Sequence, residues 1–145
     1  MRFAFEDEQL ELADAVRDLL IREVPASRVR EAWDSDDGRL HDVWAKLADM
    51  GVLGLMVPEA HGGFGLSEEE LVLALTECGR VALPDPVLSS AMVVAPMLAE
   101  VIGQEHPPEG AVELATTWLE RLPGGATAVP AFPAAKTVAF ANSDD

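Results

Sequence analysis

The stretch from Val87 to Ile102 constrains the fold more than any other part of the sequence, because it is apolar on nearly every side. Its only polar side chains are Ser89, Ser90 and Glu100. Such a helix is stable in water only when other elements surround it. A short membrane span is the alternative, but Pro96 interrupts the stretch and both flanks are acidic. We therefore expect a buried core helix that Pro96 kinks or ends early.

Four other segments have the periodicity of amphipathic helices. Apolar residues recur every three or four positions in residues 7–23, 40–50, 67–79 and 111–122. Residues 26–33 have room for a further turn or two. The expected core residues are Trp44, Leu47, Leu71, Ala74, Leu75 and Cys78, and the stripe of the last helix is Leu114, Thr117, Trp118 and Leu122. The pattern predicts an all-α bundle of five or more helices.

Start and stop signals mark the ends of these helices. Pro25 ends the first, and Gly51 supplies the stop of the second. Ser67 and Glu70 have the spacing of a capping box, in which each side chain bonds the other residue's backbone N–H. Asp85, which a proline follows, is expected to cap the apolar helix. These signals agree with the apolar periodicity and so support the all-α fold.

The segments outside the helices differ in kind. Val52 to Val57 is a short apolar run and is interpreted as an extended buried segment. The loop at 58–66 has three glycines in four positions, which indicates a sharply folded backbone or a close approach by another group. Lys136 to Ala141 is predicted to be a β-strand with no partner in the sequence. We expect a helical domain at 1–122 and a tail at 123–145, the start of a missing or vestigial β domain.

Composition narrows the classes of function. The 145 residues include 26 acidic and 10 basic side chains, a net charge of −16, which disfavours nucleic acid and anionic membrane surfaces as partners. Cys78 is the only cysteine and the three histidines are scattered, so no structural metal site is expected. The N-terminus lacks the pattern of a signal peptide, and cytoplasmic residence is the expectation.

No catalytic constellation is recognised in the residues themselves. The glycines at 62–65 fit neither the Rossmann nor the Walker pattern. His61 could bind an anion, although an exposed loop position is favoured. The acids at 68–70 could form an acid–base pair, although acids at a helix start more often complement the macrodipole. Ser89 and Ser90 could face a cavity, although hydrogen bonds to their own helix are favoured.

Residues 44–67, WAKLADMGVLGLMVPEAHGGFGLS, closely resemble part of the N-terminal helical domain of the acyl-CoA dehydrogenases. Supporting matches lie at 5–9 with 16–20, at Glu77-Cys78-Gly79-Arg80, at 87–98 and at 118–122. The likeness covers roughly residues 3–130. It implies an N-terminal helical bundle domain of the acyl-CoA dehydrogenase type with a short strand-like C-terminal tail.

Members of this family are flavoproteins of fatty-acid or lipid metabolism, which remove a proton and a hydride from the α and β carbons of an acyl-CoA thioester. The family's catalytic base lies in a C-terminal four-helix bundle. Most FAD contacts come from a middle β domain and from a neighbouring subunit. The resemblance therefore implies that this chain carries no catalytic, cofactor-binding or metal-binding residue and does not bind FAD alone.

One departure from the family concerns the segment after the last helix. The family has a strand with T-E-P-x-x-G-S, which meets flavin and thioester, where this chain has TAVPAFPAAK from Thr127 to Lys136. The Thr-Glu pair and the Gly-Ser pair are absent. Some bacterial relatives form mixed oligomers in which one subunit has lost its flavin-binding residues, and this departure is similar. A truncated or decaying copy would also explain it.

The resemblance assigns roles to two groups of residues. The helix that matches 87–98 lines part of the acyl pocket in the family. Candidate neighbours of the acyl chain are therefore Leu88, Ser89, Met92 and Val93, although core packing is favoured for most of them. A structural loop near the closed end of the pocket would contain Pro58, Glu59, Gly62, Gly63 and Gly65.

We expect the N-terminal domain or a fragment of an FAD-dependent acyl-CoA dehydrogenase, inactive alone. The alternative is a non-catalytic helical subunit that packs on a flavin-bearing acyl-CoA dehydrogenase partner, and a third is a small protein of unrelated function. The apolar helix and the unpaired strand leave surface to be covered. The expected partners are a second copy of the chain or a flavin-bearing subunit, with acyl-CoA bound by the complete enzyme.

Overall fold

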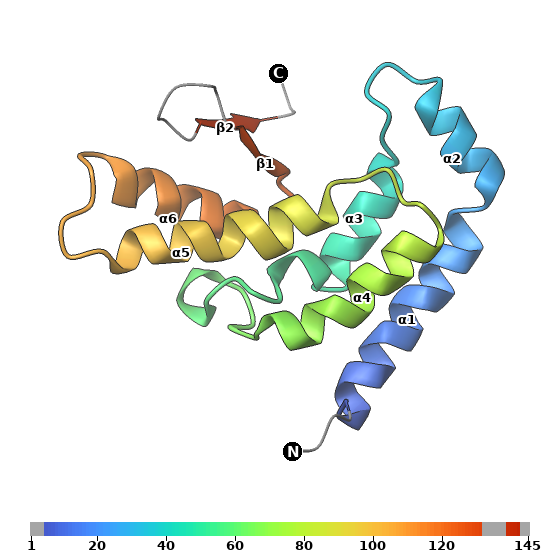
Figure 1. Ribbon diagram of the computed structural model, residues 1–145, viewed down its shortest axis with the longest axis horizontal. Coiled ribbons are helices and arrows are strands. Elements are labelled where there is room, and N and C mark those ends of the chain that lie inside the picture. Colours follow the sequence, from blue (N-terminus) through green and yellow to red (C-terminus); the bar gives the residue numbers. More distant parts are fainter. Residues whose placement is uncertain (1–4, 132–138, 143–145) are drawn as a thin grey trace.

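The computed structural model describes residues 5–131 and 139–142, with side chains described for residues 5–128. Its elements in chain order are α1 (Asp7–Glu23), α2 (Ala26–Trp33), α3 (His41–Asp49), η1 (Val52–Gly54), η2 (Glu59–His61), α4 (Glu68–Arg80), η3 (Leu88–Val94), α5 (Ala95–Gly103), α6 (Ala111–Arg121), β1 (Ala128–Ala131) and β2 (Ala139–Asn142). The predicted all-α bundle is confirmed, with one short hairpin after it (Figure 1).

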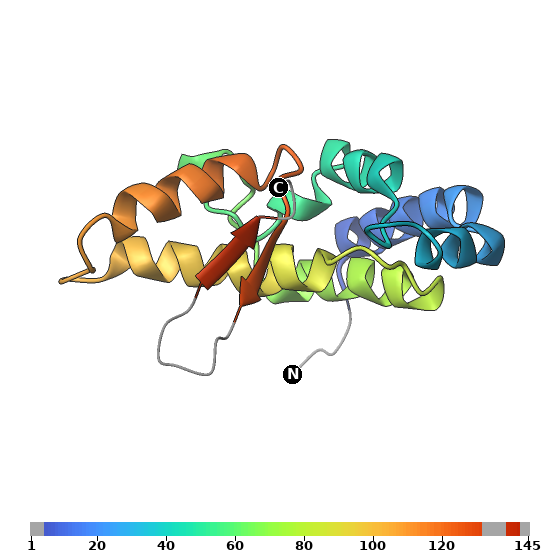
Figure 2. The ribbon, with the colours of Figure 1, turned by 90° about the horizontal axis from the view of Figure 1, so that it is seen from above.

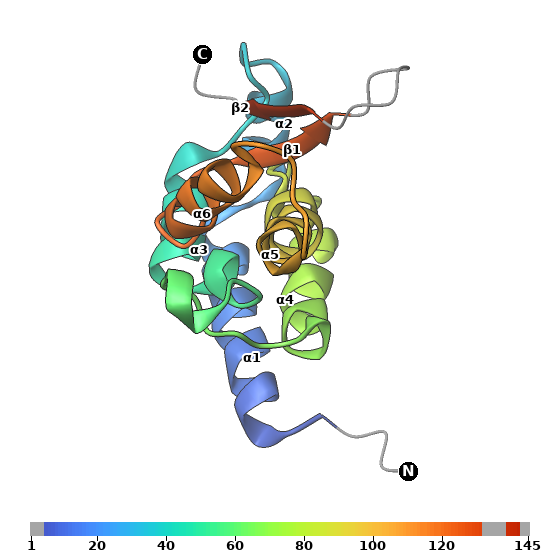
Figure 3. The same cartoon turned by 90° about the vertical axis from the view of Figure 1, so that its left-hand side faces the viewer.

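Two apolar clusters form the interior. The first, around α1, α3 and α4, includes the fully buried residues Val16, Leu20, Val43, Leu47, Leu53 and Leu71. The second, around α5 and α6, includes Val94, Leu98, Trp118, Leu119 and Leu122. The helix at 87–103 contributes Val87 and Ala91 to the first cluster and Val94 and Leu98 to the second. This helix therefore joins the two halves, and α6 lies beside it in Figures 1 and 3.

The predicted core is largely confirmed. Trp44, Leu47, Leu71, Ala74 and Cys78 are buried, while Leu75 is partly buried against the first cluster. The predicted face of α6 is wrong in part, because Leu114 and Thr117 are exposed. The buried face of that helix is instead Ala115, Trp118, Leu119 and Leu122. A short helix with apolar residues on two stripes does not reveal which stripe finds a neighbour.

The predicted capping box at the start of α4 is present, with the Ser67 N–H donating to Glu70 Oε2 at 3.0 Å.

Polar contacts hold α1 against α4. Glu77 is 4% exposed, and its Oε1 accepts from Arg17 Nη2 at 2.8 Å. This hydrogen bond holds the pKa of Glu77 below its ordinary value of 4.5 and raises the pKa of Arg17. Arg80 Nε lies 3.3 Å from the same oxygen.

The segment Val52 to Val57 is buried as predicted but is not extended. Gly51 has φ +80°, a conformation that favours glycine, and η1 follows it as a 3-10 turn. Val52, Leu53, Leu55 and Val57 are each at most 4% exposed. Six consecutive apolar residues carry no periodicity, so burial could be inferred from them while the turn could not.

Pro96 does not end the apolar helix. The turn η3 is π-helical, and the Ala95 N–H donates to the Ser90 carbonyl five residues earlier. Pro96 consequently falls in the first turn of α5. A proline inside a helix lacks the N–H that would bond a carbonyl of the preceding turn, and the π-helical hydrogen-bond pattern before it accommodates this break. The widened turn is thus how this sequence carries a proline through a continuous helix.

Asp85 is not the cap of that helix. Its buried carboxylate accepts hydrogen bonds from Arg39 Nε at 3.0 Å and from the Leu40 N–H at 3.1 Å. The side chains of Asp85 and Arg39 are 0% and 9% exposed. The aspartate therefore fastens the start of α3 to the segment before η3. Sequence spacing placed it at a helix start, but its partners are 45 and 46 residues away.

The C-terminal strand has a partner, contrary to the sequence-based expectation. The strand β2 overlaps the predicted strand at 136–141, of which residues 136–138 lie outside the described residues. It pairs antiparallel with β1, with Ala128 opposite Asn142. Pro130 cannot donate to a ladder and is typical of an edge strand, which is why β1 was not recognised in the sequence.

Candidate functional site

The candidate residues lie on one face of the helix at 87–103, named here the open face and defined by Leu88, Ser89, Met92 and Val93. Leu88 is 54% exposed, while Ser89, Met92 and Val93 are half-buried. Met92 also packs against the first cluster. The π turn has more residues per turn than an α-helix, so residues four and five apart share a face. The structure thus brings the four candidates together without covering them.

The opposite face of the same helix is closed. Its members are Val87, Ser90, Ala91, Val94, Ala95 and Leu98, each at most 2% exposed. The helix therefore separates a filled core from a surface that carries three apolar side chains and one hydroxyl. Such a surface can hold an apolar chain, and its one polar side-chain group is the Ser89 hydroxyl.

Ser90 corrects the expectation that both serines bond their own helix. Its hydroxyl donates to the Ala128 carbonyl at 2.8 Å, and the Ala128 N–H lies 3.2 Å from the same oxygen. Ser89 makes no side-chain hydrogen bond within the part of the chain that the structure describes. Strand β1 consequently begins against η3, on the closed face that carries Ser90. Figure 2 shows β1 and its partner β2 as a short hairpin.

The glycine loop is built by backbone geometry. Gly62 and Gly65 have φ +82° and +63°. A Cβ on Gly63 would overlap the carbonyl oxygen and the side chain of Val57. The Gly65 N–H donates to this same carbonyl at 2.8 Å. Pro58 immediately precedes η2, and the Glu59 side chain is exposed.

His61 is half-buried rather than exposed as expected. Its Nδ1 is buried and has no hydrogen-bond partner within the described residues. The acids at the start of α4 cap the helix, since Glu70 accepts from the Ser67 N–H and hydroxyl. These hydrogen bonds hold the pKa of Glu70 below its ordinary value. Glu70 therefore acts as a capping residue of α4, and the macrodipole interpretation of the acidic run stays a prediction.

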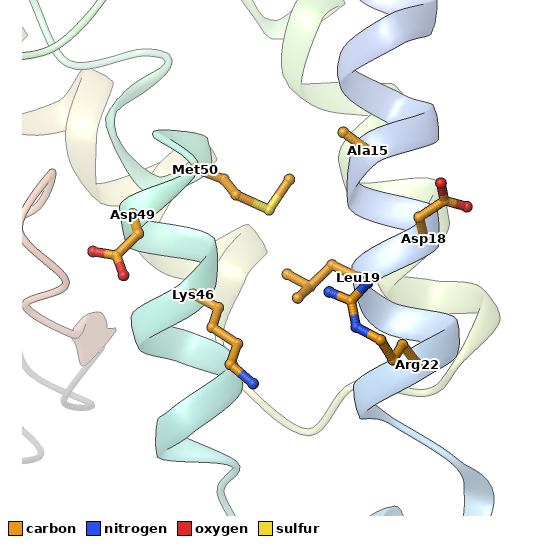
Figure 4. Close-up of a pocket in the computed structure, with 7 residues that line it drawn as sticks. All are labelled: Ala15, Asp18, Leu19, Arg22, Lys46, Asp49 and Met50. Atoms are coloured by element: carbon orange, nitrogen blue, oxygen red, sulfur yellow. The ribbon is translucent and has the colours of Figure 1, made fainter.

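A groove of about 400 Å³ lies between α1 and α3 (Figure 4). It is lined by Ala15, Asp18, Leu19, Arg22, Lys46, Asp49 and Met50. Lys46 Nζ and Arg22 Nε both pair with Glu23, at 2.9 and 3.2 Å. Its acidic and basic side chains balance, so the groove gives no reason to expect a particular ligand.

Two further features bear on what the site can hold. Among the described side chains, no three metal-ligating groups come together. Within the described ranges, no helix is long and apolar enough to cross a bilayer.

Sequence reasoning missed the contacts that hold residues 125–128 against the bundle. Trp44 Nε1 donates to the Gly125 carbonyl at 2.6 Å, and Ser90 bonds Ala128. The buried ion pair of Asp85 and Arg39 is linked to Trp44, since the Arg39 guanidinium lies over the Trp44 ring at 5.0 Å from its centroid. One signal was available: an aspartate inside the apolar run after α4 had to find a partner.

The sequence matches a known protein family over most of the chain. Residues 6–106 match the family described as acyl-CoA dehydrogenase, N-terminal domain. The chain belongs to this family.

Curated relatives include acyl-CoA dehydrogenase IpdE2 of Mycobacterium tuberculosis, 29% identical over 94 residues, or 64% of this chain and 30% of the relative. Acyl-CoA dehydrogenase IpdE2 of Mycolicibacterium smegmatis is 27% identical over 103 residues, or 70% of this chain and 32% of the relative. The chain thus spans about a third of the length of these relatives.

Two solved structures resemble this one. A variant of the Tcur3481–Tcur3483 steroid ACAD matches with TM-score 0.65 and 28% identity, covering 83% of this chain and 30% of that one. The ChsE4–ChsE5 complex from Mycobacterium tuberculosis matches with TM-score 0.70 and 24% identity, covering 86% of this chain and 32% of that one. The second likeness bears on the fold alone.

Proposed function

We propose that this chain acts as the N-terminal domain of an FAD-dependent acyl-CoA dehydrogenase that oxidises the α,β bond of acyl-CoA thioesters in the cytoplasm. The observation that carries the proposal is the open face on a helix whose other side is closed. Leu88 is 54% exposed beside the half-buried Met92 and Val93, so this face offers a small apolar surface to a ligand or a partner. The resemblance to the family, in which the matching helix lines part of the acyl pocket, supports this assignment.

The described residues do not fit FAD by themselves. The chain has Thr127 and Ala128 where the family has the Thr-Glu pair, and these residues are 3% and 0% exposed. A buried threonine and a buried alanine offer no group to a flavin outside the domain. We therefore assign flavin binding and the catalytic base to another domain or subunit, and we assign to this chain one apolar wall of the acyl pocket.

The alternative candidate is a non-catalytic helical subunit on a flavin-bearing acyl-CoA dehydrogenase partner. The departure at Thr127 and Ala128 favours it, because a subunit that lacks flavin contacts still needs a flavin-bearing neighbour for the chemistry. The steroid ACAD that resembles this chain is named for two proteins, Tcur3481 and Tcur3483, which also supports association with a second subunit. Because that structure is named a steroid ACAD, a steroid acyl-CoA is the first thioester to test.

The experiment compares two leucines of equal exposure on different faces. Leu88 on the open face is 54% exposed, and Leu114 on α6 is 51% exposed. The chain is co-expressed with the flavin-bearing acyl-CoA dehydrogenase subunits of its own organism, as wild type, Leu88→Asp or Leu114→Asp. We expect the wild type and Leu114→Asp to co-purify with a yellow partner whose flavin is bleached by acyl-CoA. Leu88→Asp should lose co-purification or bleaching.

Two results would contradict the proposal. A yellow preparation of the chain alone would show that it binds flavin by itself. Equal co-purification and bleaching with all three forms would show that the open face does not face partner or substrate. Circular dichroism of each variant serves as the folding control, since both leucines are exposed and neither substitution disturbs the core.

A further inference from the structure

The chain leaves the helical bundle through a short segment that is held at two points. After α6 ends at Arg121, the backbone passes Gly125 and enters β1 at Ala128. At the first point, Trp44 Nε1 donates to the Gly125 carbonyl at 2.6 Å. At the second, the Ser90 hydroxyl bonds both backbone groups of Ala128. Three hydrogen bonds from two side chains therefore fix four consecutive residues.

Both side chains are buried; the Ser90–Ala128 hydrogen bonds are fully buried and the Trp44–Gly125 hydrogen bond is part-buried. Trp44 is 4% exposed and Ser90 is 1% exposed. Gly125 has φ +93°, a conformation that favours glycine and turns its carbonyl toward the indole. A Cβ on this glycine would lie 3.3 Å from the Ala48 side chain. The glycine thus lets the segment lie close on α3.

Trp44 is itself held in place from the other side. The Arg39 guanidinium stacks over its ring at 5.0 Å from the centroid, and Asp85 anchors that guanidinium through the 3.0 Å ion pair. Asp85 lies two residues before the helix that carries Ser90. The contacts therefore run from the start of this helix, through Arg39 and Trp44, to Gly125, and return to the helix through Ala128.

We propose that Trp44 and Ser90 form a latch that holds residues 125–128 against the bundle and so sets where β1 begins on the closed face of the helix at 87–103. Ser90 lies next to Ser89, so a single turn of helix holds the strand with one serine and lines the open face with its neighbour. Ser90 is then a positioning residue for the wall of the acyl pocket. This last step rests on the proposed function, while the latch itself does not.

The test uses amide and indole resonances of the full-length chain in solution. The variants are Ser90→Ala, Trp44→Phe and the double variant, and Ser89→Ala is the matched control on the same turn. Loss of a buried hydrogen bond should raise hydrogen exchange at the Ala128 amide about tenfold or more in Ser90→Ala. Exchange in α1 and α4 should change much less, and the double variant should exceed either single one.

The indole resonances give a second readout that a general loss of stability would not move selectively. The Trp44 Nε1–H resonance should shift in Ser90→Ala, because loosening of Ala128 also loosens Gly125. Trp33, which is 66% exposed, and Trp118 of the second cluster should keep their resonances. Asp85→Asn should move the Trp44 resonance as well, through Arg39.

Three outcomes would overturn the latch. Unchanged exchange at Ala128 in Ser90→Ala would show that the hydroxyl does not hold the strand. An equal rise at Ala128 and throughout α1 and α4 would show a uniform loss of stability in place of a local release. An equal effect of Ser89→Ala would remove the distinction between the two serines. None of these measurements involves flavin or acyl-CoA, so they are independent of the proposed activity.

Discussion

The two faces of the helix at 87–103 have similar side chains and opposite surroundings. Leu98 on the closed face is 2% exposed, and Leu88 on the open face is 54% exposed. Val94 and Val93 are neighbours in the chain, yet the first is fully buried and the second is not. The difference teaches that an apolar residue of this helix has one of two surroundings: one face fills the core of the domain, and the other faces outward, where we propose that it meets a ligand or a partner.

The largest expected effect comes from truncating one leucine on each face. Leu98→Ala should lower the free energy of unfolding by about 2–4 kcal/mol, because it opens a cavity in the second cluster. Leu88→Ala should change it by no more than about 0.5–1 kcal/mol, since the side chain is already largely in water. Urea unfolding followed by far-ultraviolet circular dichroism measures both. Equal losses would abolish the contrast between the faces.

A second prediction concerns the buried Glu77 of α4 and the pH dependence of its contribution to the free energy of unfolding. Glu77→Gln should cost about 1–2 kcal/mol, because the buried carboxylate that binds Arg17 loses its charge. The pKa of Glu77 is lowered in the folded state, so its contribution is complete above the ordinary value of 4.5 and is lost as the pH falls below it.

The measurement is the difference in unfolding free energy between wild type and Glu77→Gln across the acid range. The difference should be constant near neutral pH and should shrink as the pH falls below 4.5. Leu88→Ala, on the open face, should show a difference from wild type that does not vary with pH. A Glu77→Gln difference that grows on acidification would mean that the sign of the linkage is wrong.

The smallest expected effect adds one hydroxyl to each face. Val94→Thr puts a polar group into the second cluster and should destabilise by about 1–2 kcal/mol. Val93→Thr, half-buried on the open face, should cost less than about 0.5 kcal/mol. Thermal unfolding of the two variants side by side gives the comparison. A larger loss for Val93→Thr would show that the open face is packed after all.

Local features of the fold could be predicted from sequence, and contacts between distant segments could not. The capping box of Ser67 and Glu70 and the stop at Gly51 depend on residues within a few positions, and both are present. Asp85 was misread because its partners lie 45 and 46 residues away, and Ser90 because its partner lies 38 residues away. A polar residue in an apolar run shows that a partner is needed but not where it lies.

The candidate site follows the same division. The resemblance to the family selected Leu88, Ser89, Met92 and Val93, and the structure places them on a single face. The exposure of this face depends on where the other helices pack, and the apolar periodicity of one helix does not contain that information. The π turn that brings residues four and five apart together was also not predicted, because Pro96 indicated only a kink or an end.

Hydrogen exchange of the chain, free and mixed with a flavin-bearing acyl-CoA dehydrogenase subunit of its own organism, tests the central claim most directly. The account predicts that the complex slows exchange in residues 87–97. It predicts little change in α6, where the equally exposed Leu114 serves as the reference surface. Unchanged exchange at 87–97 in a complex that forms, or protection confined to α6, would contradict the claim that the open face is the surface to be covered.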